Sequence, residues 1–191
     1  SSGSITLAPD GSAQATFEES ISGTQAASMR ALFENQAEQE KRLSGLLAQH
    51  YPGATLNSFE VSGLTSDSPA VELRLVAKIP GFARMDGGIL SIPIHANPTG
   101  VLEQHGQLGT RRHALHLPQL SLERTLTKLR LPKETQITEL PPPALLSNPF
   151  ATYTLKVTQA SDQIVVEESL VFKEATIRPD DYPEFRRFLQ A

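Results

Sequence analysis

The sequence predicts a mainly β protein of the α+β class, built as an antiparallel β-sandwich or a twisted sheet with an inserted helical hairpin and a C-terminal helix. Two observations lead to this class. Apolar and polar residues alternate with a period of two along several segments, most cleanly from Val71 to Ile79. Helix signals are confined to the stretch from Thr24 to His50 and to the residues after Pro179. Residues 1–191 are expected to form a single β-rich domain, with a possible boundary between two lobes in a loop at residues 96–110.

The composition is ordinary for a soluble globular protein, with 39% hydrophobic and 20% charged residues. The net charge is −4, and basic residues gather only in the pairs Lys41-Arg42, Arg111-Arg112 and Arg186-Arg187. Such pairs do not form the extended basic surface that nucleic acids require, so a nucleic-acid partner is excluded. Cysteine is absent, which excludes disulfides, thiolate metal sites and a cysteine nucleophile within this chain.

The chain is not expected to insert into a membrane. It has no apolar run near the roughly 20 residues that span a bilayer. The opening Ser1-Ser2-Gly3-Ser4 lacks the basic and apolar regions of a signal peptide. This beginning in small polar residues predicts a segment taken from a larger protein.

The first expected element is a β-hairpin. Pro9-Asp10-Gly11 separates two alternating segments, Ile5 to Ala8 and Ala13 to Ile21, and Asp-Gly at such a position is a strong hairpin signal. Glu19 falls on the apolar face of the second strand. A buried carboxylate there would indicate function, whereas a strand-end side chain that reaches solvent is the favoured interpretation.

A helical hairpin should follow. Ser22 and Gln25 have the spacing of a capping box for a helix that ends near Asn35. A second helix has an apolar stripe, and Tyr51-Pro52-Gly53 stops it. Leucines on one stripe favour core packing over binding to a partner or a membrane, because the polar face is not basic enough for lipid. The stripe consists of Leu43, Leu46 and Leu47.

The middle of the chain predicts further strands. Leu56 to Val61 changes its apolar phase, which predicts a bulge. After the strand at Val71 to Ile79, Asp86-Gly87-Gly88 turns the chain into a strand at Ile89 to Ile94. Residues 96–110 are rich in Gly and Pro and predict a long surface loop.

A long strand is predicted at Leu120 to Leu131. Its leucines change phase, which again predicts a bulge: Leu120, Leu122 and Leu126 share one phase, and Leu129 and Leu131 share the other. Pro132 suits the first central position of the next turn. Gln136 to Leu140 is predicted to return as a strand before Pro141-Pro142-Pro143 enforces an extended passage.

The final segment predicts two strands and a helix. Phe150 to Val157 and Gln163 to Phe172 alternate and form a hairpin. Asp181 and Glu184 have capping-box spacing at the start of the helix. This helix is expected to be structural because it carries a continuous apolar stripe of Tyr182, Phe185, Phe188 and Leu189.

Few residues are candidates for chemistry. His113 and His116 have metal-like spacing, with His95 and His105 upstream, but residues three apart on a strand project to opposite faces. Two surface histidines are therefore predicted, not a metal site. Asp180 and Asp181 resemble an acid/base pair, although helix capping explains them better.

Asn148-Pro149-Phe150 matches a tripeptide used in trafficking but is better explained as a turn followed by the first inward residue of a strand. Neither a Gly-x-Ser-x-Gly elbow nor a glycine-rich phosphate loop is present. No catalytic, cofactor-binding or metal-binding residue is predicted, and the chain is not expected to be an enzyme.

The order of the short motifs gives a resemblance to a known family. In the C-terminal half they are Leu131-Pro132-Lys133, Glu139-Leu140-Pro141, Asn148 to Tyr153, Leu170 to Lys173 and Ile177 to Leu189. Before them come Asp10 to Ala13, Arg30-Ala31-Leu32 and Tyr51 to Ala54. This succession resembles the C-terminal segment of large bacterial transglutaminase-like proteins, where a domain of unknown function follows the transglutaminase-like core. The resemblance covers nearly the whole chain, and the closing tyrosine-proline helix is its most specific part.

The resemblance implies a β-rich accessory domain, exported to the periplasm or cell surface. Its partner would be a protein or the neighbouring transglutaminase-like domain, which it would position or cap. The family's Cys, His and Asp belong to the preceding core, so no catalytic role passes to a residue here. The alternatives are an independent adhesion or scaffolding domain of the bacterial envelope, acting through strand edges or an apolar patch, and a hydrolase with dispersed catalytic residues.

Overall fold

The computed structural model describes residues 1–94, 105–117, 122–160 and 162–190. The protein is mainly β and contains a large mixed sheet, which confirms the predicted fold class. The chain forms two compact units. Unit 1 comprises Ser1–Ala96, Thr127–Gln136 and Gln159–Val165, and unit 2 comprises Asn97–Leu126, Ile137–Thr158 and Val166–Ala191. One division lies within the predicted loop at 96–110, of which residues 96–104 are outside the described part; a single domain stays a prediction.

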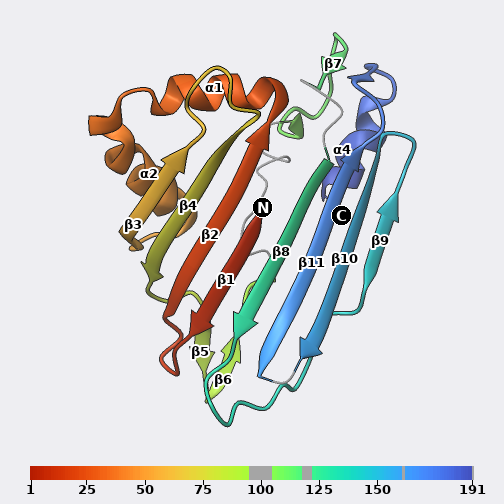
Figure 1. The fold of residues 1–191 in the computed structure, drawn as a ribbon. Helices are drawn as coiled ribbons and strands as arrows, with labels where there is room; N and C mark the ends of the chain where they lie inside the picture. The colour runs from red at the N-terminus through yellow and green to blue at the C-terminus, as the bar shows by residue number, and fades with distance from the viewer. Residues whose placement is uncertain (95–104, 118–121, 161, 191) are drawn as a thin grey trace. The chain divides into compact units, whose positions relative to one another are not determined.

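Unit 1 is organised on antiparallel strands in the order β3-β4-β2-β1, followed by the end of β8. Ala15 of β2 lies opposite both Ile5 of β1, in the predicted hairpin, and Ala77 of β4. The sheet is mixed because β1 and β8 run in the same direction (Figure 1). The bounds are Ser2–Leu7 for β1, Ala13–Ser22 for β2, Thr55–Ser62 for β3, Ala70–Ile79 for β4 and Leu122–Arg130 for β8.

The turn of the first hairpin explains why Asp10-Gly11 occurs there. The Asp10 carboxylate accepts hydrogen bonds from the Ser12 amide at 2.9 Å and from its hydroxyl at 2.7 Å. Gly11 has a φ of 82°, and its carbonyl accepts from the Ala83 amide at 2.8 Å. A Cβ at Gly11 would collide with the Ala83 carbonyl oxygen, so only glycine fits.

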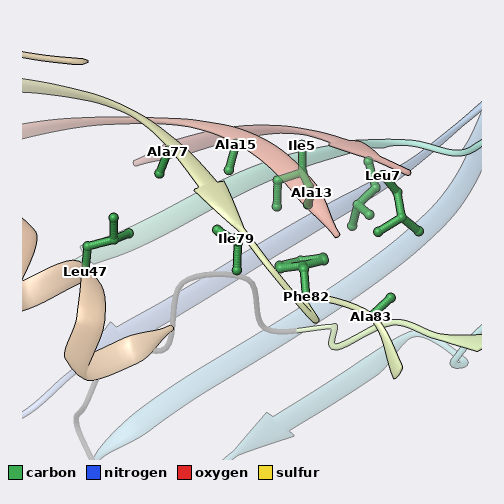
Figure 2. Close-up of a cluster of buried hydrophobic side chains, with 10 residues drawn as sticks. Ile5, Leu7, Ala13, Ala15, Leu47, Ala77, Ile79, Phe82 and Ala83 are labelled. Atoms are coloured by element: carbon green, nitrogen blue, oxygen red, sulfur yellow. The ribbon is translucent and has the colours of Figure 1, made fainter. Parts of the chain in front are cut away.

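The largest core cluster of unit 1 joins the strands to a helix and a loop. In Figure 2 the labelled side chains of β1, β2 and β4 lie near Leu47 of a helix and Phe82 of the segment after β4. Small and large side chains alternate here, because alanines on β2 and β4 leave room for Phe82 and Leu47. The buried members are Ile5, Leu7, Ala13, Ala15, Leu47, Ala77, Ile79, Phe82, Ala83 and Leu129.

The predicted helical hairpin is confirmed as α1 (Gly23–Phe33) and α2 (Gln36–His50). The predicted cap was wrong: Ser22, which pairs with Ala70 as the last residue of β2, makes no side-chain cap hydrogen bond. The side chain of Asn35 instead caps α2 by accepting from the Ala37 amide at 3.1 Å.

The apolar stripe of α2 differs from the prediction in one member. Leu43 and Leu47 are buried, but Leu46 is 42% exposed. Gln39 takes the place of an apolar residue on the buried face, where its amide nitrogen donates to the Phe33 carbonyl at 2.8 Å. This bond satisfies a carbonyl at the end of α1, which makes burial of the polar side chain tolerable.

Two further predictions for unit 1 are confirmed. The register of β3 against β4 shifts between Leu56 and Ser58, where the apolar phase change predicted a bulge. The Asp86-Gly87-Gly88 turn joins β5 (Arg84–Asp86) to β6 (Ile89–Ser91), which pair antiparallel, although the second strand ends at Ser91 and not at Ile94 as predicted.

The bulge predicted within β8 was wrong. Burial alternates without a shift from residue 123 to residue 130, so no bulge occurs there. Leu126 faces outward and is 39% exposed, whereas Thr127 and Leu129 are buried. A threonine therefore holds an inward position that a pattern of leucines alone did not reveal.

The predicted strand at residues 136–140 does not form, and β9 (Ala144–Ser147) occurs after the three prolines instead. The turn before it starts one position later than predicted. The Thr135 amide donates to the Pro132 carbonyl at 3.3 Å, which makes Pro132 the first residue of the turn. Glu134 then adopts a φ of 66°.

Unit 2 contains the strand order β8-β11-β10-β9, which includes the predicted final hairpin. Figure 1 shows α4 (blue) beside this hairpin, and buried side chains of the two pack together in the core of the unit. A short pair of strands, β7 and β12, completes the unit. The bounds are Leu115–His116 for β7, Ala151–Ala160 for β10, Gln163–Phe172 for β11, Thr176–Ile177 for β12 and Tyr182–Gln190 for α4.

Helix α4 is structural, as predicted. Tyr182 and Phe185 are fully buried, and Phe188 and Leu189 pack against the same core cluster. The Phe185 ring meets Phe150 edge to face, with ring centroids 6.3 Å apart, and lies 6.1 Å from Phe172. Within the described residues, no helix is long and apolar enough to cross a bilayer.

We expect Phe185→Ala to lower the free energy of unfolding by about 3 to 5 kcal/mol, because it removes a fully buried ring from between two others. Phe188→Ala, a half-buried position on the same helix, should cost less. Urea unfolding of both variants measures the difference. Equal losses would mean that the two aromatic positions are equivalent and that α4 is not seated by Phe185.

Candidate functional site

Helix α4 fixes the backbone of residues 105–111 through polar contacts. The Tyr182 hydroxyl lies 2.9 Å from the carbonyl oxygen of His105 and 2.9 Å from that of Leu108. A tyrosine has one hydroxyl hydrogen, so the two carbonyls share a single donor. Arg186, one turn later, donates from Nε to the Gly106 carbonyl at 2.9 Å. We call this arrangement of residues 105–111, Tyr182 and Arg186 the loop–helix lock.

Arg111 completes the lock from the loop side. Its guanidinium carbon lies 5.0 Å from the centroid of the Tyr182 ring, a cation–π contact worth about 0.5 to 2 kcal/mol. Its Nε is buried without a hydrogen-bond partner among the described residues. The buried tyrosine is therefore held by its hydroxyl and also stabilises a positive charge on its ring face.

The lock presents an apolar side chain to water. Leu108 is 53% exposed, although its own carbonyl is bound by Tyr182. The adjacent Gly109 is exposed and has open space around its Cα. An exposed leucine on a backbone held by its neighbours can bind without the entropy cost of ordering a loop.

The imidazole of His105 lies beside the positive charge of the lock. Partial burial is the main cause that lowers its pKa below the ordinary value of 6.5, and the charge of Arg111 lowers it further. Folding therefore favours the neutral form of the His105 imidazole.

A second polar cluster lies where β9 leads into β10. The Asn148 side-chain oxygen accepts from the amides of Phe150 at 2.9 Å and Ala151 at 2.8 Å, which confirms that Asn148 turns the chain. Lys173 donates to the Ser147 hydroxyl at 2.9 Å and to the Asn148 carbonyl at 2.8 Å. Phe150 is buried and begins the inward face of the hairpin, as predicted.

The contact between Ser147 and Lys173 has the composition of a serine–lysine nucleophile pair. A lysine serves as a general base only where burial favours its neutral form. Lys173 is exposed and donates to two oxygens, and Ser147 also lies 3.0 Å from the Thr152 hydroxyl. The contact is better explained as a brace that fixes the turn between β9 and β10.

A tyrosine and a carboxylate also meet in the hairpin. The Tyr153 hydroxyl donates to Glu168 at 2.9 Å. Burial raises the pKa of Tyr153, and the hydrogen bond and negative charge of Glu168 raise it further. The phenol is therefore a stable donor that satisfies a half-buried carboxylate.

The structure keeps the predicted candidate residues apart. His113 and His116 are exposed, and the His116 Nδ1 lies 3.1 Å from the Thr176 hydroxyl across the β7–β12 pair. No group of three or more potential metal ligands gathers in the part of the chain that the structure describes. His95 lies outside the described residues.

The acidic candidates have structural partners or face water. The Asp181 carboxylate accepts from Arg178 Nε at 2.8 Å, just before α4, while Asp180 is exposed. Glu19 is exposed, in agreement with the strand-end interpretation, although partial desolvation raises its pKa.

Sequence patterns did not predict the loop–helix lock. Tyr182 was expected only as a member of the apolar stripe, and no pattern indicated that its hydroxyl binds carbonyls 74 and 77 positions earlier in the chain. Arg111 and Arg186 were noted only as members of basic pairs. The one available signal was the presence of a tyrosine in a stripe expected to be buried, since the hydroxyl of a buried tyrosine needs a hydrogen-bond partner.

We expect Tyr182→Phe to lower the free energy of unfolding by about 1 to 3 kcal/mol, because it leaves two carbonyls without their donor. Tyr51→Phe is the matched control. Tyr51 stacks 5.9 Å from Phe17, burial raises its pKa to about 12, and its hydroxyl has no partner among the described residues. Removing the Tyr51 hydroxyl should leave the free energy of unfolding unchanged or raise it, as measured by thermal and urea unfolding. A larger loss of stability for Tyr51→Phe than for Tyr182→Phe would contradict the stabilising role of the lock.

The neutral His105 predicts a pH dependence. Because its pKa is lower in the folded state, the unfolded chain binds a proton first, so stability is full above about pH 6.5 and is lost as the pH falls. Denaturant midpoints at about pH 7.5 and 5.5 should therefore differ more for the native chain than for His105→Asn. Equal differences would show that His105 does not carry this dependence.

Comparisons with known proteins place the chain in a family. Residues 91–191 match the model of a domain of unknown function with a solved structure, DUF3858. No curated protein matches the sequence. A similar solved structure is that of "a putative protease" from Parabacteroides distasonis ATCC 8503, with 14% identity and a TM-score of 0.43. The similarity covers 74% of this chain and 22% of that one, so the chain spans about a fifth of that protein's length.

The matched residues contain the whole loop–helix lock and the final hairpin. Since the family model covers more than half of the sequence, the chain belongs to DUF3858, a family of domains of unknown function.

Proposed function

We propose that this chain is a non-catalytic accessory domain that binds protein within a larger, exported, transglutaminase-like protein. The observation that carries the proposal is the exposed Leu108 on a backbone fixed by α4. The proposed partner is the neighbouring transglutaminase-like domain, which rests on the resemblance of the motifs described above.

The geometry of the lock supports binding in preference to catalysis. Burying one leucine at an interface contributes about 1.5 to 3 kcal/mol, and a pre-ordered backbone retains most of that gain. The polar groups around the leucine are structural, because the Tyr182 hydroxyl and Arg186 Nε are committed to loop carbonyls.

A second candidate function is adhesion or scaffolding through a sheet edge. β9 is the terminal strand of its sheet, and Leu145 on it is 70% exposed. A terminal strand offers backbone groups that an added strand of another protein can pair with. β9 has only four residues, which favours the Leu108 surface as the main site.

The test compares two exposed leucines. The domain that adjoins this one in the native polypeptide is expressed as a separate chain, and binding is measured by isothermal titration calorimetry. Leu108→Ser should weaken binding about tenfold or more, while Leu145→Ser should leave it unchanged. Neither change touches the backbone contacts of the lock.

The reverse sensitivity would favour the edge of β9 and the scaffolding function. Absence of binding by the native pair would contradict the accessory role. Turnover of ester or peptide substrates by this chain, abolished in Lys173→Met, would replace the proposal with a hydrolase.

A further inference from the structure

The two segments that the lock joins are basic in a chain that is acidic overall. Residues 105–113 and helix α4 carry four arginines against a single glutamate, a formal charge of +3, whereas the whole chain has −4. The arginines are Arg111, Arg112, Arg186 and Arg187, and the glutamate is Glu184. Both segments belong to unit 2, and the lock joins them directly.

The four arginines have two different roles. Arg186 and Arg111 are half-buried and hold the lock, one through the Gly106 carbonyl and the other on the ring of Tyr182. Arg112 and Arg187 are exposed. The lock therefore places exposed guanidinium groups on the same two segments that fix Leu108.

We propose that this surface, made of Leu108, Arg112 and Arg187, binds an acidic polypeptide segment that carries an apolar side chain. The inference rests on the proposed function and names the chemistry of its partner. Guanidinium groups bind carboxylates with two parallel hydrogen bonds, and the exposed Leu108 offers an apolar contact on the same loop as Arg112. The complementary charge speeds association and fixes the orientation of the segment.

Other anionic partners fit this surface less well. Single-stranded nucleic acids are bound by basic grooves with aromatic rings for stacking, and here the ring of Tyr182 is fully buried. Anionic membranes attract larger basic clusters, and a net charge of −4 opposes approach of the chain to them. An acidic protein segment matches both the charge and the exposed leucine.

The test uses fluorescent peptides of equal length with one central leucine, flanked by glutamates, glutamines or lysines. The fluorescence anisotropy of each peptide is measured as the whole chain is added. The glutamate peptide should bind more tightly than the glutamine and lysine peptides. The affinity should fall several-fold between about 20 and 200 mM salt, because screening shortens the range of charge attraction. The double variant Arg112→Glu with Arg187→Glu should weaken binding about tenfold or more.

Two controls make the result specific. Lys41→Glu with Lys128→Glu reverses two exposed charges in unit 1 and should leave binding unchanged. Unfolding curves of both double variants should show folded proteins, since none of these four side chains belongs to the lock; a small decrease is expected for the arginine variant because Arg187 lies in the last turn of α4.

The possible results separate the two proposals. Equal binding of the glutamine peptide, with sensitivity to Leu108→Ser but not to the arginine changes, would keep protein binding and overturn the acidic partner. Binding of none of the peptides would overturn the acidic partner, and the calorimetric test with the neighbouring domain would still decide the accessory function. Binding of an oligonucleotide or of phosphatidylserine vesicles in place of the glutamate peptide would also overturn it.

Discussion

The organisation of unit 2 depends on the complete burial of one tyrosine. Tyr182 has no exposed surface, so its hydroxyl must find an acceptor inside the protein or cost about 1 to 3 kcal/mol. It finds two, the carbonyls of His105 and Leu108, which ties the start of α4 to a loop far away in sequence. The apolar part of the same side chain packs with Phe185 in the core of the unit. Tyr182 thus both stabilises the core of unit 2 and fixes the position of a surface loop.

The contacts of Tyr182 link the packing of a structural helix to an exposed residue of the loop. Phe185 seats the helix between Phe150 and Phe172, and the polar contacts of Tyr182 and Arg186 then carry that rigidity to Leu108. A leucine exposed on a free loop would lose entropy on binding, whereas this one is ordered beforehand. Unit 1 also contains a contact that fixes a distant segment: the Gly11 carbonyl in a hairpin turn accepts a hydrogen bond from the Ala83 amide.

The polar clusters of the chain illustrate why contact alone does not indicate catalysis. Ser147 and Lys173 lie within hydrogen-bond distance, and Tyr153 donates to Glu168 in the hairpin of β10 and β11. Each contact provides a hydrogen-bond partner for a polar group whose position is set by the strands. Lys173 is exposed and donates to two oxygens, while burial and the neighbouring Glu168 raise the pKa of Tyr153 and so keep its phenol a hydrogen-bond donor.

The sequence by itself determined the elements whose signals are local. Asp10-Gly11 specified a turn, alternation specified β4, and a phase change located the bulge between Leu56 and Ser58, because backbone conformation and side-chain period act over a few residues. Only the tertiary structure decided which polar groups are buried. Thr127 faces inward and Leu126 outward, and the Tyr182 hydroxyl reaches carbonyls more than 70 positions away, because each depends on neighbours brought together by folding. The candidate site was therefore invisible in the sequence, although its arginine pairs and its aromatic helix were both present there.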